Sequence, residues 1–457
     1  MNFIEKILPF VFRFKEIKKE LVWILVGQAL SFVGGFIGIK VLTGLMGPAG
    51  YGELALGLTI AGIFTIYFYG PLSNVVARFY SVYREKRKLA VYFSVLKKVH
   101  NHLALAMILL TVSGTIITSV WLGYKWGIII ALSLFYGIAS GVNASFISLQ
   151  SAIRQRRVVA IHQGLDVWLR IGISIGLLIL LTADSANVLL GYLIGTVLVT
   201  ISQYFAARRS PAICDGWNAS YSDSAAEKKC LREFAAYALP FFIFALFATI
   251  STYADRWVLQ AVSGVASVGI YAAIYQIASS PVNLFFSMVN QLVVPIVFER
   301  AGALTSPQQI KKSAELVSIT VLASIIAMVP LIVIAWYFGE PLVRMLTNSA
   351  FSAEHQMLWI TLAGLAIFNI AQLVALKGVY GNQPGIYFWP KAVQAAALVG
   401  LGLLLTARLG LTGMAVALCC SSLIYLAAVI YVNNRICFNI SQDSSTLQSN
   451  NHQDGRF

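Results

Sequence analysis

Three ionisable residues recur at intervals of four within one apolar stretch of the sequence. If this stretch is helical, His162, Asp166 and Arg170 share one face, and Asp166 and Arg170 can form an ion pair. Alternatively, the guanidinium of Arg170 contacts a phosphate, with Asp166 or His162 as a proton site. On a membrane helix such a polar stripe must point inward, toward water or toward a neighbouring helix. Both interpretations, a structural ion pair and a phosphate contact, are open at this point.

A second group of charges lies near the predicted outer ends of two other apolar stretches. Lys40 belongs to the first of these stretches, and Arg256 belongs to a later one, where Asp255 can hold it in an ion pair. A charged side chain near the middle of a bilayer costs about 2.5–3.5 kcal/mol on insertion scales. Lys40 and Arg256 are therefore expected to face an aqueous cavity. The alternative is that both extend to the outer interface.

Three further cations, Arg78, Lys377 and Lys391, lie at the predicted inner ends of apolar stretches. They fit a cationic entrance, and they fit anchors at the inner interface equally well. Five Lys or Arg lie within the apolar stretches against two acids, and a path with positive walls concentrates anions. A pyrophosphate group suits Arg because the planar guanidinium grips phosphate oxygens. These residues therefore predict a cationic path for an anionic substrate.

The elements that position these charges must be membrane-spanning helices. Of the 457 residues, 58% are hydrophobic and 11% are charged, whereas soluble chains carry about 25% charged residues. Each apolar run is long enough to cross about 30 Å of hydrocarbon, and backbone groups cannot stay unpaired in lipid. The sequence therefore predicts an all-α polytopic membrane protein with twelve spans. These are residues 21–43, 54–77, 99–121, 127–150, 158–181, 187–207, 234–261, 268–294, 314–338, 355–379, 386–407 and 411–433.

The distribution of Lys and Arg predicts the orientation of the spans. The N-terminus and every second connection hold 25 of the 33 Lys and Arg, and the intervening connections hold three. Positively charged loops stay in the cytoplasm, so both termini are predicted to be cytoplasmic. The net charge of +15 is then mainly a topology signal, reinforced by anionic lipids of the inner leaflet. Nucleic acid is not expected as a partner.

The predicted spans divide into two lobes. Residues 1–20 are predicted to form a cytoplasmic amphipathic N-terminus without a signal-peptide cleavage site, and residues 21–207 an N-lobe of six spans. Residues 208–232 are predicted to be a cytoplasmic linker, and residues 233–434 a C-lobe of six spans. Residues 435–457 are rich in Ser, Gln and Asn, which predicts a disordered cytoplasmic tail.

The two predicted lobes resemble each other at one connection. Residues 44–56 have the sequence GLMGPAGYGELAL, and residues 261–273 have AVSGVASVGIYAA. At a constant offset of 217, Gly47, Ala49, Gly52 and Ala55 match Gly264, Ala266, Gly269 and Ala272. Since each lobe has an even number of spans, a repeat would relate the lobes by a pseudo-two-fold axis along the membrane normal. Chance matches among small residues are the alternative.

Several stretches are similar to a known family. Residues 27–57, GQALSFVGGFIGIKVLTGLMGPAGYGELALG, are followed by YGPLSNVVARFYS at residues 69–81. In the second half, YALPFFIFALFATISTYADRWVL at residues 237–259 is followed by VGIYAAIYQIASSPVNLFF and VVPIVFE. Over residues 20–435 the chain resembles bacterial oligosaccharide flippases of polysaccharide biosynthesis, of the O-antigen type. The resemblance implies the two-lobed fold of twelve helices shared with multidrug and toxic-compound extruders.

The resemblance also implies a substrate and partners. An undecaprenyl-pyrophosphate-linked oligosaccharide would move from the inner to the outer leaflet of the bacterial inner membrane by alternating access, for O-antigen, capsule or exopolysaccharide synthesis. Membrane lipids and other polysaccharide-assembly proteins would be partners. The 20 Tyr could stack on sugar rings, although most are expected at the membrane interfaces or in packing.

The sequence is also compatible with other classes of function. A drug or metabolite exporter of the extruder type would call for acids in the first lobe if its drugs were cationic, and the first span offers Lys40. A peptidoglycan-precursor flippase is a function closer to the expected one. A structural scaffold is a less expected function. A membrane glycosyltransferase or polymerase needs catalytic groups on sizeable outer loops, and the predicted outer loops are short. Neither an enzyme nor a cofactor is expected, because no GxxxxGK[ST] motif and no metal-ligand spacing of cysteines occurs.

Overall fold

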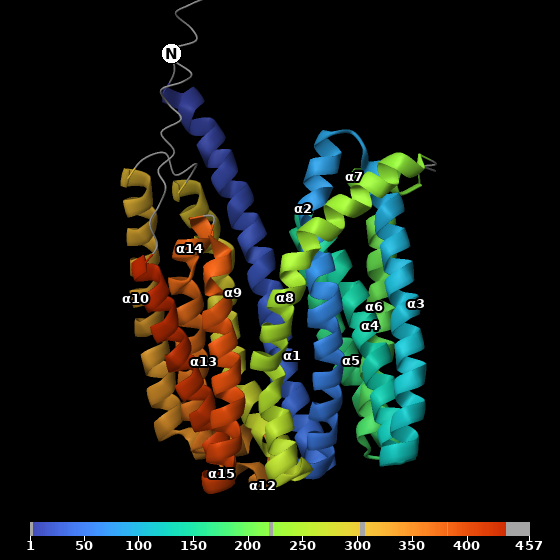
Figure 1. Cartoon of the computed structure of the whole chain (residues 1–457), viewed down its shortest axis with the longest axis vertical. Helices are drawn as coiled ribbons and strands as arrows, with labels where there is room; N and C mark the ends of the chain where they lie inside the picture. The colour runs from blue at the N-terminus through green and yellow to red at the C-terminus, as the bar shows by residue number, and fades with distance from the viewer. Residues whose placement is uncertain (1–2, 219–222, 302–306, 382, 436–457) are drawn as a thin grey trace, which may run out of the picture. The chain divides into compact units, whose positions relative to one another are not determined.

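A computed structural model describes residues 3–218, 223–301, 307–381 and 383–435 of the chain. These residues are almost entirely helical and include no strand (Figure 1). The predicted all-α class is thereby confirmed. The predicted disordered tail lies outside the described residues, apart from Arg435. The helix α1 begins at Phe3, so the predicted surface segment is helical from that residue, and its amphipathic character stays a prediction.

Long helices dominate the fold. The long helices are α1 (Phe3–Phe64), α3 (Leu89–Leu122), α4 (Tyr124–Ala152), α5 (Arg156–Leu180), α6 (Ser185–Arg208), α8 (Ser224–Ser263), α9 (Val265–Ala301), α10 (Pro307–Tyr337), α13 (Met357–Val374) and α15 (Phe388–Arg435). The shorter elements are η1 (Thr65–Tyr69), α2 (Gly70–Glu85), α7 (Pro211–Asn218), α11 (Gly339–Leu346), α12 (Ser349–Ser352), α14 (Leu376–Tyr380) and η2 (Pro384–Tyr387). Ten helical segments among the described residues are long and apolar enough to cross a membrane.

Two of these ten segments have at least 51 residues and can cross a bilayer twice. The first covers 64 residues, Val22–Glu85, which would measure about 96 Å as a straight helix. Non-helical backbone at Gly47 breaks it, and Gly410 breaks α15 in the same way. Both glycines have positive φ, 66° and 63°, which most residues with a Cβ adopt only with strain. Ten segments with two such breaks are compatible with twelve spans, and the count of twelve stays a prediction.

The matched glycines of the predicted repeat share one backbone conformation. Gly47 has φ 66° and ψ −178°, and Gly264, its counterpart at an offset of 217, has φ 81° and ψ 175°. Each glycine stands where one helical stretch ends and the next begins. The sequence match therefore corresponds to a local structural match, and the symmetry between whole lobes stays a prediction.

The described residues form two compact units. Unit 1 runs to Ala273 and includes Val343–Ala353, and unit 2 comprises Ile274–Leu342 and the residues from Glu354 on. The helix α7 and the start of α8, at Ser224, lie within the predicted linker 208–232, so these parts of it are helical. The contacts of α8 are with helices of unit 1. The predicted lobes, 21–207 and 233–434, stay a prediction.

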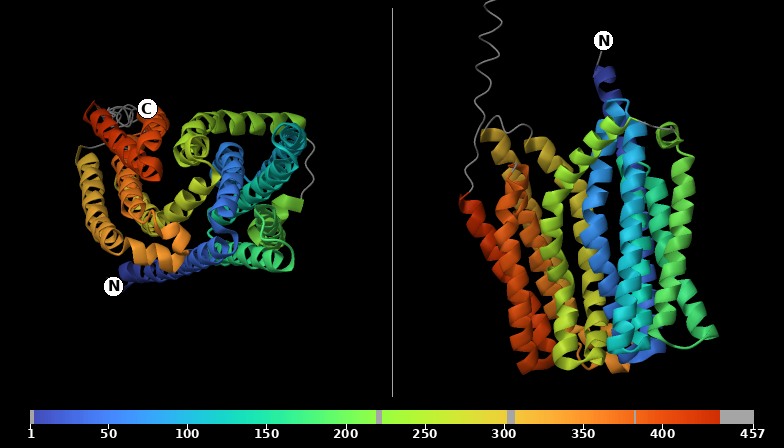
Figure 2. Two further views of the ribbon diagram at one scale, coloured as in Figure 1. Left: turned by 90° about the horizontal axis from the view of Figure 1, so that it is seen from below. Right: turned by 45° about the vertical axis from the view of Figure 1, so that its right-hand side comes forward.

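In unit 1, α4 lies at the centre of the packing. It contacts α1, α3 and α6, while α5 packs against α1 and α6 (Figures 1 and 2). Glycines let these helices approach closely. A Cβ on Gly195 of α6, for example, would lie 2.8 Å from the backbone nitrogen of Arg170 on α5. The close approach of α5 and α6 therefore occurs at one of the predicted site residues.

In unit 2, α13 packs along both α10 and α15. Its core includes Ala371 of α13 together with Tyr387, Tyr425 and Val429. The hydroxyl of Tyr387 accepts a hydrogen bond from the backbone nitrogen of Gly378 and donates one to Asn433, at 2.8 and 2.5 Å. These bonds attach α14 to the end of α15.

Candidate functional site

The spacing of Asp166 and Arg170 on α5 places the two side chains in direct contact. Nη2 of Arg170 lies 3.0 Å from Oδ2 of Asp166, and the two side chains are 21% and 15% exposed. Nε of Arg170 also donates to the carbonyl oxygen of Asp166 at 3.1 Å. The other carboxylate oxygen accepts a hydrogen bond from Thr196 of α6 at 2.9 Å. The ion pair expected from the sequence is present, and α6 helps to hold it.

Two tyrosine rings flank the guanidinium of Arg170. It lies 5.9 Å from the ring centre of Tyr136 on α4 and 5.4 Å from that of Tyr192 on α6. The two rings meet edge to face at 5.7 Å, and Nη1 of Arg170 donates to the hydroxyl of Tyr136. Cation–π contacts of this kind stabilise the cation by about 0.5–2 kcal/mol. Arg170 is therefore fixed from three helices.

Arg170 keeps hydrogen-bonding capacity despite these contacts. A guanidinium has five N–H donors, and three of them point to Asp166 and Tyr136. The other two have no acceptor among the described residues. Arg170 precedes Leu180, the last residue of α5, by ten residues, which is about 15 Å of helix. Its guanidinium is thus a partly accessible donor about halfway along a membrane-spanning helix.

A second ion pair lies on α8. Nη1 of Arg256 contacts Oδ1 of Asp255 at 2.8 Å, and the two side chains are 11% and 2% exposed. Oδ2 of Asp255 accepts a hydrogen bond from the hydroxyl of Tyr271 on α9, also at 2.8 Å. Arg256 further donates to the carbonyl oxygen of Thr252 at 2.8 Å. The pair suggested by the adjacent residues in the sequence is present, and it connects α8 to α9.

Two further tyrosines interact with members of the two ion pairs. Tyr51 is within electrostatic range of both Tyr192 and Arg256. Tyr253 lies 5.9 Å from the guanidinium of Arg256 and is within electrostatic range of Tyr136. We define the charge cluster of unit 1 as the two ion pairs with their tyrosines: Tyr51, Tyr136, Asp166, Arg170, Tyr192, Tyr253, Asp255, Arg256 and Tyr271. Each Arg in this cluster has its own carboxylate, so any affinity for an anion comes from N–H donors rather than from net charge.

The rest of the polar stripe on α5 faces α6. His162 is buried, and its ring nitrogens lie 2.8 Å from the carbonyl oxygen of Val158 and 3.1 Å from the hydroxyl of Ser202. Ser174 is also buried and donates to the carbonyl oxygen of Val188. The stripe points inward as expected, toward a neighbouring helix. A role for His162 as a proton site stays a prediction.

Lys40 has a different environment from the two arginines. Its side chain is exposed, and Nζ donates to the carbonyl oxygen of Thr347 at 2.6 Å and to that of Arg344 at 3.4 Å. These carbonyl groups stand at the C-terminal end of α11, where a cation stabilises the helix by about 0.3–1 kcal/mol. The structure thus gives Lys40 a helix-capping contact, and no contact among the described residues joins it to the charge cluster.

The predicted inner-end cations have three different environments. The side chain of Arg78 is exposed on α2. Nζ of Lys377 donates to the carbonyl oxygen of Asn433 at 2.8 Å. The Lys377 side chain also lines a cavity of about 510 Å³ in unit 2. Lys391 is only 8% exposed. An entrance formed by all three stays a prediction.

Lys391 lies against two aromatic rings of unit 2. Its Nζ is 3.9 Å from the ring centre of Phe368 and 5.1 Å from that of Tyr425, and the two rings stack at 5.5 Å. The hydroxyl of Tyr425 donates to Gln372 at 3.0 Å. Among the described residues, Nζ of Lys391 has no carboxylate partner. It is therefore a buried cation held by aromatic faces.

A family model described as a polysaccharide biosynthesis protein matches residues 17–300, which is more than half of the chain. The chain belongs to this family. The matched residues include both ion pairs of the charge cluster. The membership confirms the family expected from the sequence. No curated protein matches the chain.

Solved structures of two kinds of transporter share the fold of this family member. The lipid II flippase MurJ in an inward closed conformation is similar with a TM-score of 0.67 and 15% identity, over 90% of this chain and 86% of that chain. The eukaryotic MATE transporter AtDTX14 is similar with a TM-score of 0.59 and 13% identity, over 93% and 97% of the two chains. The Vibrio cholerae MATE transporter VcmN in the bent form is similar with a TM-score of 0.57 and 13% identity, over 92% of this chain and 97% of that chain. The expected likeness to the extruder fold is confirmed.

The sequence did not single out the tyrosines of this family member. Most of its Tyr were expected at membrane interfaces or in packing, yet Tyr136 and Tyr192 contact Arg170, and Tyr271 bonds Asp255. A signal was present for Tyr136, which lies twelve residues from the start of α4 and thus far from either interface. A tyrosine at that depth needs a hydrogen-bond partner, and a buried charge is a suitable one.

Proposed function

We propose that this protein translocates an undecaprenyl-pyrophosphate-linked oligosaccharide from the inner to the outer leaflet of the bacterial inner membrane, for O-antigen, capsule or exopolysaccharide synthesis. The observation that carries the proposal is the partly exposed guanidinium of Arg170 with two N–H groups left for a ligand. Membership of the polysaccharide biosynthesis family and the flippase fold support it. In this proposal both termini are cytoplasmic, as the bias of 25 to three in Lys and Arg predicts.

The charge cluster suits a pyrophosphate that must be released again. The two remaining N–H groups of Arg170 can donate to phosphate oxygens, and charge-assisted bonds of this type are among the stronger ones in proteins. Asp166 competes for the same guanidinium, which keeps the anion from binding too tightly. The rings of Tyr136 and Tyr192 offer faces to a sugar. A carrier working by alternating access needs this combination of recognition and release.

The two carboxylates of the cluster are the candidates for ion coupling. Asp166 and Asp255 are both contacted by an arginine and by a hydroxyl. A proton or metal cation that took one of these carboxylates would weaken its bond to the arginine. The freed guanidinium would then bind an anion more strongly. In this proposal, the ion gradient and the substrate act on the same two pairs.

A second candidate function is export of drugs or metabolites. The observation that favours it is the combination of aromatic rings with the two carboxylates of unit 1, which could hold an organic cation, together with the MATE-like fold. Loss of the gene would then change drug susceptibility and leave surface polysaccharide intact.

Paired substitutions at the first ion pair test the proposal. In cells that depend on this protein for surface polysaccharide, Arg170→Gln should lower the polysaccharide while protein levels stay normal. The double variant Asp166→Asn/Arg170→Gln removes both charges and leaves no carboxylate without its partner, and it should still not restore polysaccharide. Arg157→Gln makes the same change elsewhere on α5, beside Trp23, and should have little effect. If the double variant made normal amounts of polysaccharide, the Asp166–Arg170 pair would have a structural role and no role in substrate transport.

A further inference from the structure

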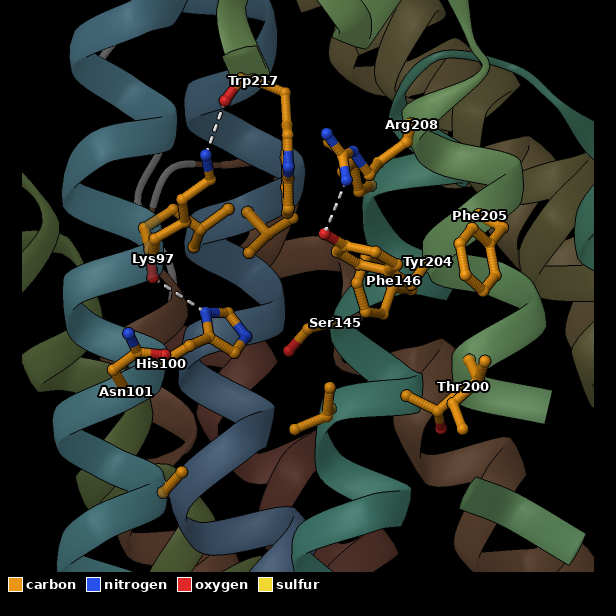
Figure 3. Close-up of a pocket in the computed structure, with 16 residues that line it drawn as sticks. Lys97, His100, Asn101, Ser145, Phe146, Thr200, Tyr204, Phe205, Arg208 and Trp217 are labelled. Carbon is orange, nitrogen blue, oxygen red and sulfur yellow. Dashed lines mark hydrogen bonds between the residues drawn. The ribbon is translucent and has the colours of Figure 1, made fainter. Parts of the chain in front are cut away.

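A groove in unit 1 lies outside the charge cluster. Figure 3 shows its walls, with Lys97, His100 and Asn101 on α3 facing Thr200, Tyr204 and Arg208 on α6. Its floor is α4, which contributes Ser145 and Phe146, and its volume is about 820 Å³. The helix α7 contributes Trp217 at one end. None of these residues belongs to the charge cluster or to the cations expected from the sequence.

Two cations lie at the end of the groove beside α7. Nζ of Lys97 donates to the carbonyl oxygen of Trp217 at 2.6 Å and lies 4.6 Å from the centre of its ring. Arg208 donates to the hydroxyl of Tyr204 at 3.3 Å. Both cations line the same end of the groove (Figure 3), and like charges repel each other. An anion between them would relieve this repulsion, since opposite charges attract strongly at the edge of a low-dielectric region.

The walls of the groove are apolar and open toward the membrane. Ile201 and Phe205 line the groove, and they are also 48% and 53% exposed. Leu105 and Leu109 of α3 are likewise exposed, at 57% and 63%. Both helices are long and apolar enough to span a bilayer, so such residues face hydrocarbon. The groove is therefore continuous with the lipid-facing surface of α3 and α6.

Small polar side chains also line the groove, farther from α7 than the two cations. Asn101 and Thr200 extend from opposite walls, and Ser145 lies between them on the floor (Figure 3). Along α6, the apolar Phe205 and Ile201 lie between Arg208 and Thr200, so this wall offers a cation, an apolar stretch and a hydroxyl. A glycerophospholipid likewise combines an anionic phosphate with apolar acyl chains and polar ester groups.

We propose that this groove binds one anionic glycerophospholipid of the inner leaflet. Its phosphate lies between Lys97 and Arg208, and an acyl chain follows the apolar, lipid-exposed wall past Phe205 and Ile201 toward Thr200. A free anion would not need the apolar walls. A zwitterionic lipid would bring its own cation beside Lys97 and Arg208. Two basic residues near a membrane surface favour an anionic lipid by roughly tenfold or more.

Native mass spectrometry of the purified full-length protein tests this site. The protein is titrated with equal amounts of phosphatidylglycerol and phosphatidylcholine that carry the same acyl chains, and bound copies are counted. We expect one phosphatidylglycerol to be retained with about tenfold preference. Lys97→Gln/Arg208→Gln should abolish the preference. Thr200→Trp fills the groove without changing charge and should lower retention as well.

Neighbouring residues provide a matched control. Lys98→Gln/Arg209→Gln makes the same charge change at the next position along the chain from each groove cation, where neither residue lines the groove. This double variant should keep the preference for phosphatidylglycerol. Melting temperatures in the same detergent identify any variant that is unfolded. If Lys97→Gln/Arg208→Gln is unfolded, lipid retention by Thr200→Trp tests the site instead.

Three results would overturn the assignment. Equal retention of phosphatidylcholine would show that the groove does not select an anion. Equal loss in both double variants would show that surface charge alone attracts the lipid. Displacement of phosphatidylglycerol by farnesyl pyrophosphate, but not by inorganic phosphate, would assign the groove to an isoprenoid pyrophosphate instead. Surface polysaccharide is measured separately with the Arg170 variants, so failure of the lipid site leaves the proposed function standing.

Discussion

Gly52 in α1 and Gly269 in α9 pack backbone against backbone in unit 1. A Cβ on Gly52 would lie 3.0 Å from the backbone nitrogen of Gly269 and would overlap the carbonyl oxygen of Val265. A Cβ on Gly269 would lie 2.8 Å from the backbone nitrogen of Gly52 and would overlap the carbonyl oxygen of Pro48. The contact is reciprocal, because Pro48 and Val265 are separated by the same 217 residues as the two glycines. Residues matched in sequence thus meet in space as pseudo-symmetric partners.

The first prediction concerns this glycine contact. Gly52→Ala and Gly269→Ala each place a methyl group where backbone atoms already lie, so each should destabilise the protein by about 1–3 kcal/mol, as overpacking does. The double variant should lose less stability than the two single variants together, because both changes open the same contact. Melting temperature of the purified protein measures the effect. A Cβ on Gly44, also in α1, meets no atom within 4 Å, so Gly44→Ala is the control. Additive losses would contradict a shared contact.

Much of the fold could be predicted because membrane constraints leave strong signals in sequence. Long apolar runs indicated the helices, and the need for glycine at close backbone contacts made the repeat visible at Gly52 and Gly269. The spacing of four residues also predicted the Asp166–Arg170 pair correctly. Local geometry along one helix is enough to determine such a pair.

The remaining features of the site depend on tertiary packing and left no local signal. Lys40 has the same residue type and depth expected of a path cation, yet it caps α11, which lies far from it in sequence. Tyr136 and Tyr192 meet Arg170 only because α4, α5 and α6 pack together. The groove of Lys97 and Arg208 likewise joins cations that the sequence assigned to inner connections. A single sequence does not reveal which helices are neighbours.

The second prediction concerns Asp255. Asp255→Asn removes the carboxylate that contacts the guanidinium of Arg256, which is only 11% exposed. Breaking a buried pair by removing one partner costs about 3–5 kcal/mol. Tyr271→Phe removes the hydrogen bond to Asp255 and leaves both charges of the pair in place, so it should cost about 1 kcal/mol. Thermal unfolding in detergent should rank the two variants in this order. Equal losses would mean that Arg256 has an alternative partner when Asp255 is neutral.

The third prediction compares two lysines of unit 2. Lys391→Met keeps the apolar stem against Phe368 and removes a buried charge that has no carboxylate partner among the described residues. It should therefore raise the melting temperature, because the cost of burying the charge disappears. Lys377→Met loses the hydrogen bond to the carbonyl oxygen of Asn433 and should lower stability by about 1 kcal/mol. If Lys391 also contacts substrate, surface polysaccharide falls in Lys391→Met despite the higher stability. A lower melting temperature for Lys391→Met would contradict this account of its burial.

The fourth prediction separates Lys40 from substrate binding. Lys40→Gln loses the contacts to the carbonyl oxygens of Thr347 and Arg344. The loss should be about 0.3–1 kcal/mol of stability, as expected for a cation at a helix C-terminus. Surface polysaccharide should stay close to normal, in contrast to Arg170→Gln in the same assay. If polysaccharide fell while protein levels stayed normal, Lys40 would contribute to the substrate path, as the sequence predicts.

The last prediction concerns the number of spans and the break at Gly410. In α15, 22 residues from Phe388 to Leu409 precede this glycine, and 25 residues from Leu411 to Arg435 follow it. Each segment exceeds the roughly 20 residues needed to cross a bilayer. In a variant without native cysteines, Arg408→Cys should therefore react with an impermeant maleimide added outside the cell. Arg435→Cys should react only after the membrane is permeabilised. Labelling of both positions from one side would mean that α15 does not cross twice, and the count of twelve spans would be wrong.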